Sequence, residues 1–254
     1  MKLKFVICGI EHSGTTVLSD FFRQIPECDS GFECGVLLGK SPREFPNLEP
    51  FAKNMLGGWK ISGVHLLDIC QTDDFNDFYR RLAEVAQVIG DRCEYIFDKT
   101  PRYFLHLKQC IEKVDVPFVG TYKDPKAIVY SDFKREKPSD FEAWYHDYHP
   151  RKIFYLSNIY KNFMFARNNL AGRVLTVSLE DMCFNARPTL EMIFEHCGCK
   201  FRIEYLLLRG LRYPHTREPY LTTKIPLEYR DAFDEDIIAR IEKDFASLDL
   251  WFYR

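Results

Sequence analysis

The feature of the sequence that most restricts its fold is a short apolar run that enters a glycine-bounded loop near the N-terminus. The run 5–8 (Phe-Val-Ile-Cys) predicts a buried strand, and the loop 9–16 reads Gly-Ile-Glu-His-Ser-Gly-Thr-Thr. Apolar residues then recur at helical spacing from Val17 to Ile25, and Pro26 follows. A strand, a glycine loop and a helix in this order bring several backbone N–H groups to one point, which favours a bound anion.

Strands and helices alternate along the rest of the chain. The pattern predicts further strands at 95–97, 116–122 and 173–179, and helices at 77–90, 126–134, 144–169, 188–196 and 234–245. Such alternation predicts an α/β fold with a central parallel sheet flanked by helices. The segment 27–63 is rich in Gly and Pro, which favours loops and short elements. No repeat or linker interrupts the 254 residues, so we expect one domain, 1–254.

Composition excludes several classes of protein. A net charge of −2 argues against a nucleic-acid binder, whose affinity depends on a basic surface. We expect no membrane span, because no run of about 18 apolar residues occurs, and no signal peptide precedes the first strand. Nine scattered cysteines without a Cys-x-x-Cys pair predict reduced thiols rather than a metal site. Together these features favour a cytoplasmic protein.

The glycine loop lacks the lysine that nucleoside triphosphate loops place in Gly-Lys-Ser/Thr, because Thr15 follows Gly14 directly. The sequence Ser-Gly-Thr-Thr resembles the 5′-phosphosulfate loop of sulfotransferases that use PAPS (3′-phosphoadenosine 5′-phosphosulfate). The resemblance implies the P-loop-containing nucleotide-binding fold of the sulfotransferase type, with PAPS as cofactor and PAP as product. It assigns the 5′-phosphosulfate to the loop residues Glu11, His12, Ser13, Gly14, Thr15 and Thr16.

A second stretch, 122–131, is similar to the 3′-phosphate motif of the same family. There a cation ends a strand and a serine follows eight residues later, about two helical turns on. The matching residues here are Lys123 and Ser131, with Lys in place of the family's usual Arg. The family also closes this site with a late basic loop, which implicates Arg209, Arg212 and Arg217, and more weakly Tyr220 and Lys224.

The resemblance also suggests catalytic residues. Lys99 begins a Lys-Thr-Pro element that lies near the transferring group in the family, where an ammonium would stabilise developing charge. His12 stands where a basic residue is usual and could donate a hydrogen bond. The base that takes the acceptor's proton is expected to be Glu33, with His65 as the alternative. A later strand ends in Glu180-Asp181, as in the family.

These observations predict a sulfotransferase that transfers a sulfuryl group from PAPS to a hydroxyl or amine of a carbohydrate or small molecule. The nearest rival is a small-molecule kinase of the P-loop class, in which Asp98 would hold Mg²⁺. The second alternative is a catalytically degenerate protein that binds PAP without transferring sulfate. The sequence specifies neither the acceptor nor the oligomeric state.

Overall fold

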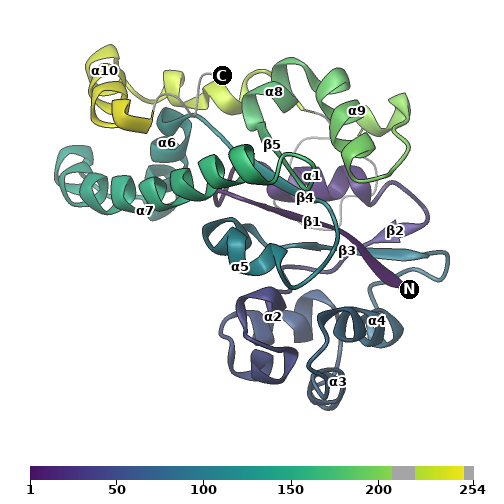
Figure 1. Ribbon diagram of the computed structural model, residues 1–254. Coiled ribbons are helices and arrows are strands. Elements are labelled where there is room, and N and C mark those ends of the chain that lie inside the picture. The colour runs from purple at the N-terminus through teal and green to yellow at the C-terminus, as the bar shows by residue number, and fades with distance from the viewer. Residues whose placement is uncertain (208–220, 249–254) are drawn as a thin grey trace.

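The computed structural model describes residues 1–207 and 221–248, and its described strands form a five-stranded sheet in the order β2-β3-β1-β4-β5 (Figure 1). Every neighbouring pair of strands is parallel. The carboxyl ends of the strands therefore share one edge, where open α/β sheets bind ligands. The expected α/β fold with a parallel sheet is confirmed. The strands are β1 (Lys2–Gly9), β2 (Cys28–Asp29), β3 (Tyr95–Lys99), β4 (Phe118–Tyr122) and β5 (Val174–Ser178).

Helices cover both faces of the sheet (Figure 1). One face packs against α1 (Thr15–Phe22), α8 (Leu179–Phe184) and α9 (Ala186–His196). The other side carries α2 (Phe51–Gly58), α3 (Gly63–Ile69), α4 (Phe75–Val85), α5 (Leu107–Ile111), α6 (Pro125–Glu136), α7 (Phe141–Asn169) and α10 (Glu235–Asp244). Short 3₁₀ helices occupy Val36–Leu38, Pro42–Asn47, Pro101–His106, Ile203–Leu206, Ile225–Asp231 and Ala246–Leu248.

The two faces of β1 supply two separate parts of the core. Successive side chains of a strand point to opposite faces, so Phe5 and Ile7 pack on the α1 side, whereas Val6 and Cys8 pack on the other. On the α1 side the rings of Phe5 and Phe22 lie 4.3 Å apart, and those of Phe22 and Phe194 lie 4.4 Å apart. This aromatic contact fixes α1, and with it the preceding loop, against the sheet.

Several element boundaries differ from the sequence-based expectation. The first helix ends at Phe22 rather than Ile25, because the next turn tightens: Gln24 N–H donates to Phe21 O and Ile25 N–H to Phe22 O. The helix expected at 77–90 is α4, which begins earlier after the capping carboxylate of Asp74 and ends at Val85. The segment 27–63 contains β2 and α2 besides its loops.

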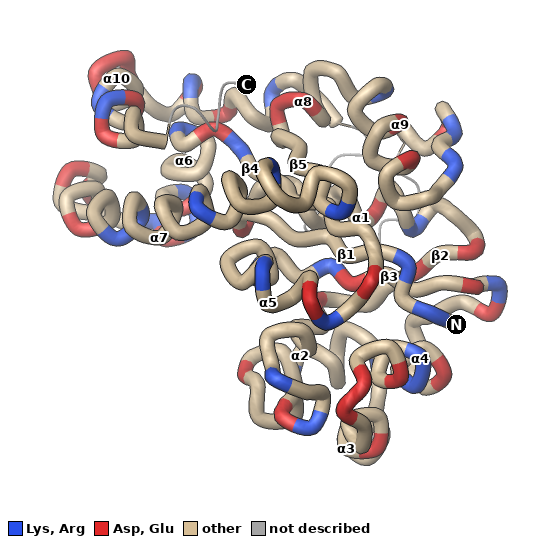
Figure 2. The backbone as a smooth tube through the Cα atoms, in the orientation of Figure 1, with Lys and Arg blue, Asp and Glu red and all other residues tan. Residues whose placement is uncertain are grey.

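The remaining composition-based expectations concern thiols and charge. The cysteines carry reduced thiols, and seven of the nine are buried. Within 1–207 and 221–248, no helix is both long and apolar enough to cross a bilayer. Acidic and basic positions are interspersed along the described backbone rather than gathered into one basic stripe (Figure 2).

We predict that Phe22→Ala lowers the free energy of unfolding by about 3–5 kcal/mol, because it leaves a cavity among the stacked rings beneath α1. Urea denaturation followed by circular dichroism measures the change. The matched control is Phe154→Ala, since that ring is 72% exposed and its loss should cost no more than about 0.5 kcal/mol. Equal losses in the two variants would contradict this account of the core.

Candidate active site

The glycine loop after β1 is fixed to β4 through Ser13. Its Oγ lies 2.6 Å from Ile10 O, 3.0 Å from Thr121 O and 2.6 Å from Thr121 Oγ1. The Ser13 N–H also donates to Ile10 O, at 3.2 Å. Ser13 therefore shapes the loop from within, and its hydroxyl faces the protein rather than the solvent side of the sheet edge.

The N-terminus of α1 follows directly and offers hydrogen-bond donors. Gly14 adopts a left-handed conformation, with φ of 89°, and an added Cβ there would lie 2.9 Å from Leu179 Cδ1. The first backbone N–H groups of a helix have no partner within the helix. Within the described residues, no side chain caps α1, and neither the Thr15 nor the Thr16 hydroxyl bonds another residue. Both features suit an anion that lies at this helix end.

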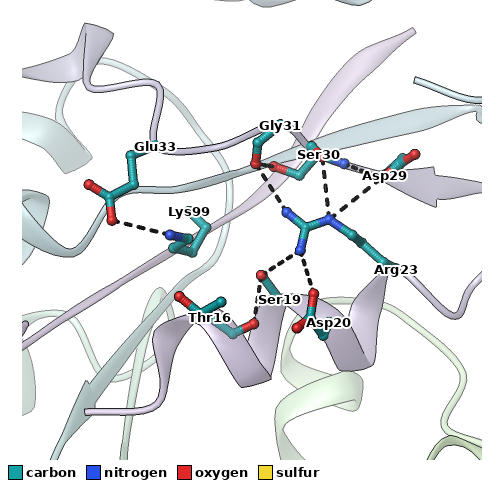
Figure 3. Close-up of polar contacts among 9 residues, drawn as sticks. All are labelled: Thr16, Ser19, Asp20, Arg23, Asp29, Ser30, Gly31, Glu33 and Lys99. Carbon is teal, nitrogen blue, oxygen red and sulfur yellow. Dashed lines mark hydrogen bonds and ion pairs between the residues drawn. The ribbon is translucent and has the colours of Figure 1, made fainter. Parts of the chain in front are cut away.

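On the β3 side of the loop, Lys99 and Glu33 meet. Lys99 Nζ lies 3.2 Å from Glu33 Oε1, and Figure 3 shows the ammonium pointing at the carboxylate. The Lys99 side chain is 1% exposed and that of Glu33 is 25% exposed. Burial lowers the pKa of Lys99, and the Glu33 charge opposes this shift. The structure thus brings together two residues that the sequence assigned separately to catalysis.

The loop that carries Glu33 is anchored by Arg23, which the sequence analysis did not identify. Its guanidinium donates to Ser30 O at 3.3 Å and to Gly31 O at 3.0 Å, and it also bonds Ser19 and Asp20 of α1 (Figure 3). Arg23 therefore joins α1 to the segment just before Glu33. No pattern in the sequence marks it, because a basic residue at the C-terminal end of a helix is common.

The same loop is anchored beyond Glu33 by a buried carboxylate, Asp98. This residue precedes Lys99 in β3 and so points to the opposite face, where it accepts hydrogen bonds from Tyr79 (2.6 Å), Tyr103 (2.7 Å) and Thr100 (2.8 Å). Thr100 Oγ1 in turn accepts from Gly35 N–H. Burial raises the pKa of Asp98, and the hydroxyl donors oppose that shift. Asp98 supports the Glu33 loop instead of facing the glycine loop.

On the β4 side, Lys123 is a buried cation. It is 4% exposed, and among the described residues its ammonium makes no hydrogen bond or ion pair. Burial lowers its pKa to about 8, while Asp132 and Glu180 raise it and Lys152 and Arg135 lower it. A buried charge without a hydrogen-bonded partner is costly, so an anionic ligand is its natural complement.

Ser131, the predicted companion of Lys123, lies half-buried on α6, which starts just after Lys123 at Pro125. The turn between them is held from α8, because Asp124 N–H donates to Glu180 Oε1 at 3.0 Å. The Asp124 side chain caps the helix by accepting from Lys126 N–H. The end of β4 and the first turns of α6 are therefore fixed in place by β5 and α8.

His12 is exposed on the glycine loop, at a φ of 65°. Partial burial of its ring, followed by the positive charges of Arg135 and Lys123, lowers its pKa to about 4. At neutral pH the imidazole is uncharged, so it can donate a hydrogen bond but adds no charge. Glu11 beside it is also exposed.

The remaining predicted residues lie elsewhere. His65 is exposed on α3, which packs on α2 and α4, and the structure does not bring it to the Lys99–Glu33 pair. Lys224 is exposed before a 3₁₀ helix. The late basic residues Arg209, Arg212 and Arg217, together with Tyr220, lie outside the described residues.

A family model described as "Sulfotransferase family" matches residues 5–202. The match covers the parallel sheet, the glycine loop, Lys99 and Lys123. The chain therefore belongs to the sulfotransferase family and is a sulfotransferase. No curated protein matches it in a sequence search.

Solved structures share the fold at low sequence identity. The sulfotransferase domain of the Synechococcus PCC 7002 olefin synthase matches with 16% identity, a TM-score of 0.61 and coverage of 95% of this chain and 93% of that one. The sulfotransferase domain from the curacin biosynthetic pathway gives 12% identity, a TM-score of 0.63 and coverage of 97% and 98%. Retinol dehydratase, in a complex with retinol and PAP, matches with 13% identity and a TM-score of 0.52. That match covers 100% of this chain and 83% of retinol dehydratase. These similarities concern the fold.

We predict that Lys123→Met raises the free energy of unfolding at pH 7 by about 1–3 kcal/mol, because it removes a buried charge that makes no hydrogen bond to residues 1–207 or 221–248. In the folded protein the pKa of Lys123 is about 8, below the ordinary lysine value of 10.5, so the buried charge costs the wild type its full stability penalty below pH 8. This stability penalty fades as the pH rises from 8 to 10.5, because Lys123 loses its proton in the folded protein at a lower pH than in the unfolded chain.

The increase in the free energy of unfolding of Lys123→Met over the wild type should become smaller between pH 8 and pH 10.5. Urea denaturation at several pH values measures it, with the exposed Lys53→Met as control. A gain that does not change between pH 7 and pH 10.5 would contradict the assignment of the shift to Lys123.

Proposed function

We propose that the protein transfers a sulfuryl group from PAPS to a hydroxyl or amine of a small molecule or carbohydrate. The observation that carries the proposal is the pair of buried lysines on either side of β1, at the edge where the glycine loop ends. Lys99 meets a carboxylate there, and Lys123 meets no hydrogen-bond partner within the described residues. One side of the edge suits proton transfer, and the other suits a phosphate.

The residues present fit PAPS. The donors at the N-terminus of α1 and the hydroxyls of Thr15 and Thr16 suit its 5′-phosphosulfate, and Lys123 with Ser131 suits its 3′-phosphate. When bound, PAPS supplies the sulfuryl group and leaves as PAP. Retinol dehydratase, which has the same fold, was solved with PAP.

In this proposal Glu33 and Lys99 divide the chemistry. The Glu33 carboxylate accepts the proton from the acceptor's hydroxyl or amine, and its anchored loop holds it in position. The Lys99 ammonium, preorganised by burial and by Glu33, places positive charge where negative charge develops. His12, neutral at pH 7, donates a hydrogen bond from the glycine loop.

The kinase alternative receives less support from this geometry. It needs a carboxylate that faces the phosphate loop to hold Mg²⁺. The carboxylate of Asp98 instead points to the opposite face of β3 and accepts from Tyr79, Tyr103 and Thr100.

The cofactor is tested by thermal-shift titration with PAP, AMP and ATP–Mg²⁺. We expect PAP to stabilise the protein more than AMP at equal concentration, because Lys123 binds the 3′-phosphate that AMP lacks. At a hundredfold excess over the dissociation constant the stabilisation is about 2.7 kcal/mol. Stabilisation by ATP–Mg²⁺ alone would favour the kinase. PAP binding without release of PAP from PAPS for any acceptor would favour the degenerate binding protein.

The base is tested by Glu33→Gln with His65→Ala as its matched comparison. Glutamine keeps the shape of the side chain but takes up no proton, so we expect kcat to fall by about 10²–10⁴-fold. PAP affinity should stay close to the wild-type value, because Glu33 lies on the β3 side of the loop. The rate of PAP release from PAPS is measured with phenols and monosaccharides as acceptors. Full activity of Glu33→Gln, with loss in His65→Ala, would reverse the assignment.

A further inference from the structure

A group of polar side chains between α6 and α7 faces Lys123. Asp132 of α6 lies at its centre: Asp132 Oδ2 accepts from Lys152 Nζ at 2.7 Å and from Tyr148 OH at 2.8 Å, and Asp132 Oδ1 lies 3.5 Å from Arg135 Nη2. Lys152 and Tyr148 both come from α7. Figure 2 shows basic positions on both helices.

Asp132 and Lys152 are largely buried although they carry charge, whereas the Arg135 side chain is 49% exposed. The side chains of Asp132 and Lys152 are 12% and 16% exposed. Lys123 interacts electrostatically with the carboxylates of Asp132 and Glu180 and with the cations Lys152 and Arg135. Lys152 is therefore a second cation close to the buried Lys123 side chain.

The ion pair with Asp132 leaves Lys152 able to bind a ligand. An ammonium carries three N–H donors, and the bond to Asp132 uses one of them. Asp132 also receives Tyr148 and Arg135, so it keeps other partners if Lys152 shifts toward a ligand. Burial raises the pKa of Asp132, but Lys152, Tyr148 and Arg135 outweigh burial, so the pKa lies below its usual value. The carboxylate therefore stays charged and holds Lys152 in place.

We propose that Lys152 is a further ligand of the cofactor's 3′-phosphate, positioned by Asp132 beside Lys123 and Ser131. The inference rests on the proposed function, which places PAPS at this sheet edge. Lys152 would supply a second cation to this site. Lys123 alone offers a point charge and lacks the bidentate geometry with which an arginine would bind the phosphate. In this proposal the 3′-phosphate is bound by a residue of α7 as well as by the residue that follows β4.

The test compares the affinities of PAP and AMP, which differ by the 3′-phosphate alone. Calorimetric titration gives the ratio of their dissociation constants for the wild type and for Lys152→Met. We expect the ratio to fall about tenfold or more in the variant, while the dissociation constant of AMP stays unchanged. Lys152→Arg should retain most of the wild-type preference.

The matched control is Lys161→Met, nine residues further along α7 and therefore on its opposite face. It removes the same charge from the same helix, and the PAP preference should keep its wild-type value. Circular dichroism checks that each variant is folded, and Lys152→Arg provides a second reading if Lys152→Met is unstable.

The outcomes separate the inference from the function on which it rests. If the wild type prefers PAP and Lys152→Met keeps that preference, or weakens AMP equally, the role of Lys152 is overturned and the proposed function stands. If the wild type binds PAP no better than AMP, the proposed function fails and the inference fails with it.

Discussion

The close approach of Gly9 to Thr121 is the contact on which the candidate site depends. The two residues are paired between β1 and β4, and a Cβ at Gly9, whose φ is 150°, would overlap Thr121. Because glycine ends the strand, Thr121 lies against the loop and both its oxygens meet Ser13 Oγ. Lys123 follows Thr121 by two residues. The donors of the loop and the buried cation therefore stand at a spacing set by the sheet rather than by flexible side chains.

The alternation of side chains along β3 divides structural from chemical roles. Asp98 points to the tyrosine side and ties down the backbone beyond Glu33, whereas Lys99 points to the α1 side and meets Glu33 itself. Both residues carry charge into the interior, where desolvation is unfavourable. Stable folds usually avoid this, and places where charge is nevertheless buried tend to be functional sites. The loop of Glu33 is thus held on both sides by polar contacts that the hydrophobic core could not supply.

Much of this arrangement could be predicted from local sequence. The β1–loop–α1 unit follows from an apolar run, two glycines and helical spacing, and the strand ends place Lys99 and Lys123 at one edge of a parallel sheet. The contact between Glu33 and Lys99 could not be predicted, because it joins residues 66 positions apart. Arg23 and Lys152 were missed for a related reason. Tyr148, Lys152 and Tyr155 do form a stripe along one face of α7, but periodicity does not say what that face meets.

Lys99 and Lys123 differ in their charged partners, and this difference makes the two sides of the sheet edge unlike. Lys99 is paired with the Glu33 carboxylate within the protein, so the two charges balance on the β3 side. Lys123 interacts with both acidic and basic side chains but, among the described residues, its ammonium makes no hydrogen bond, so the β4 side is the more favourable place for a bound anion. Under the proposed function, this difference favours a ligand that binds at the glycine loop with its 3′-phosphate toward Lys123 and its reacting group toward Lys99 and Glu33. The two cations at the sheet edge would then have different roles, one in binding and one in transfer.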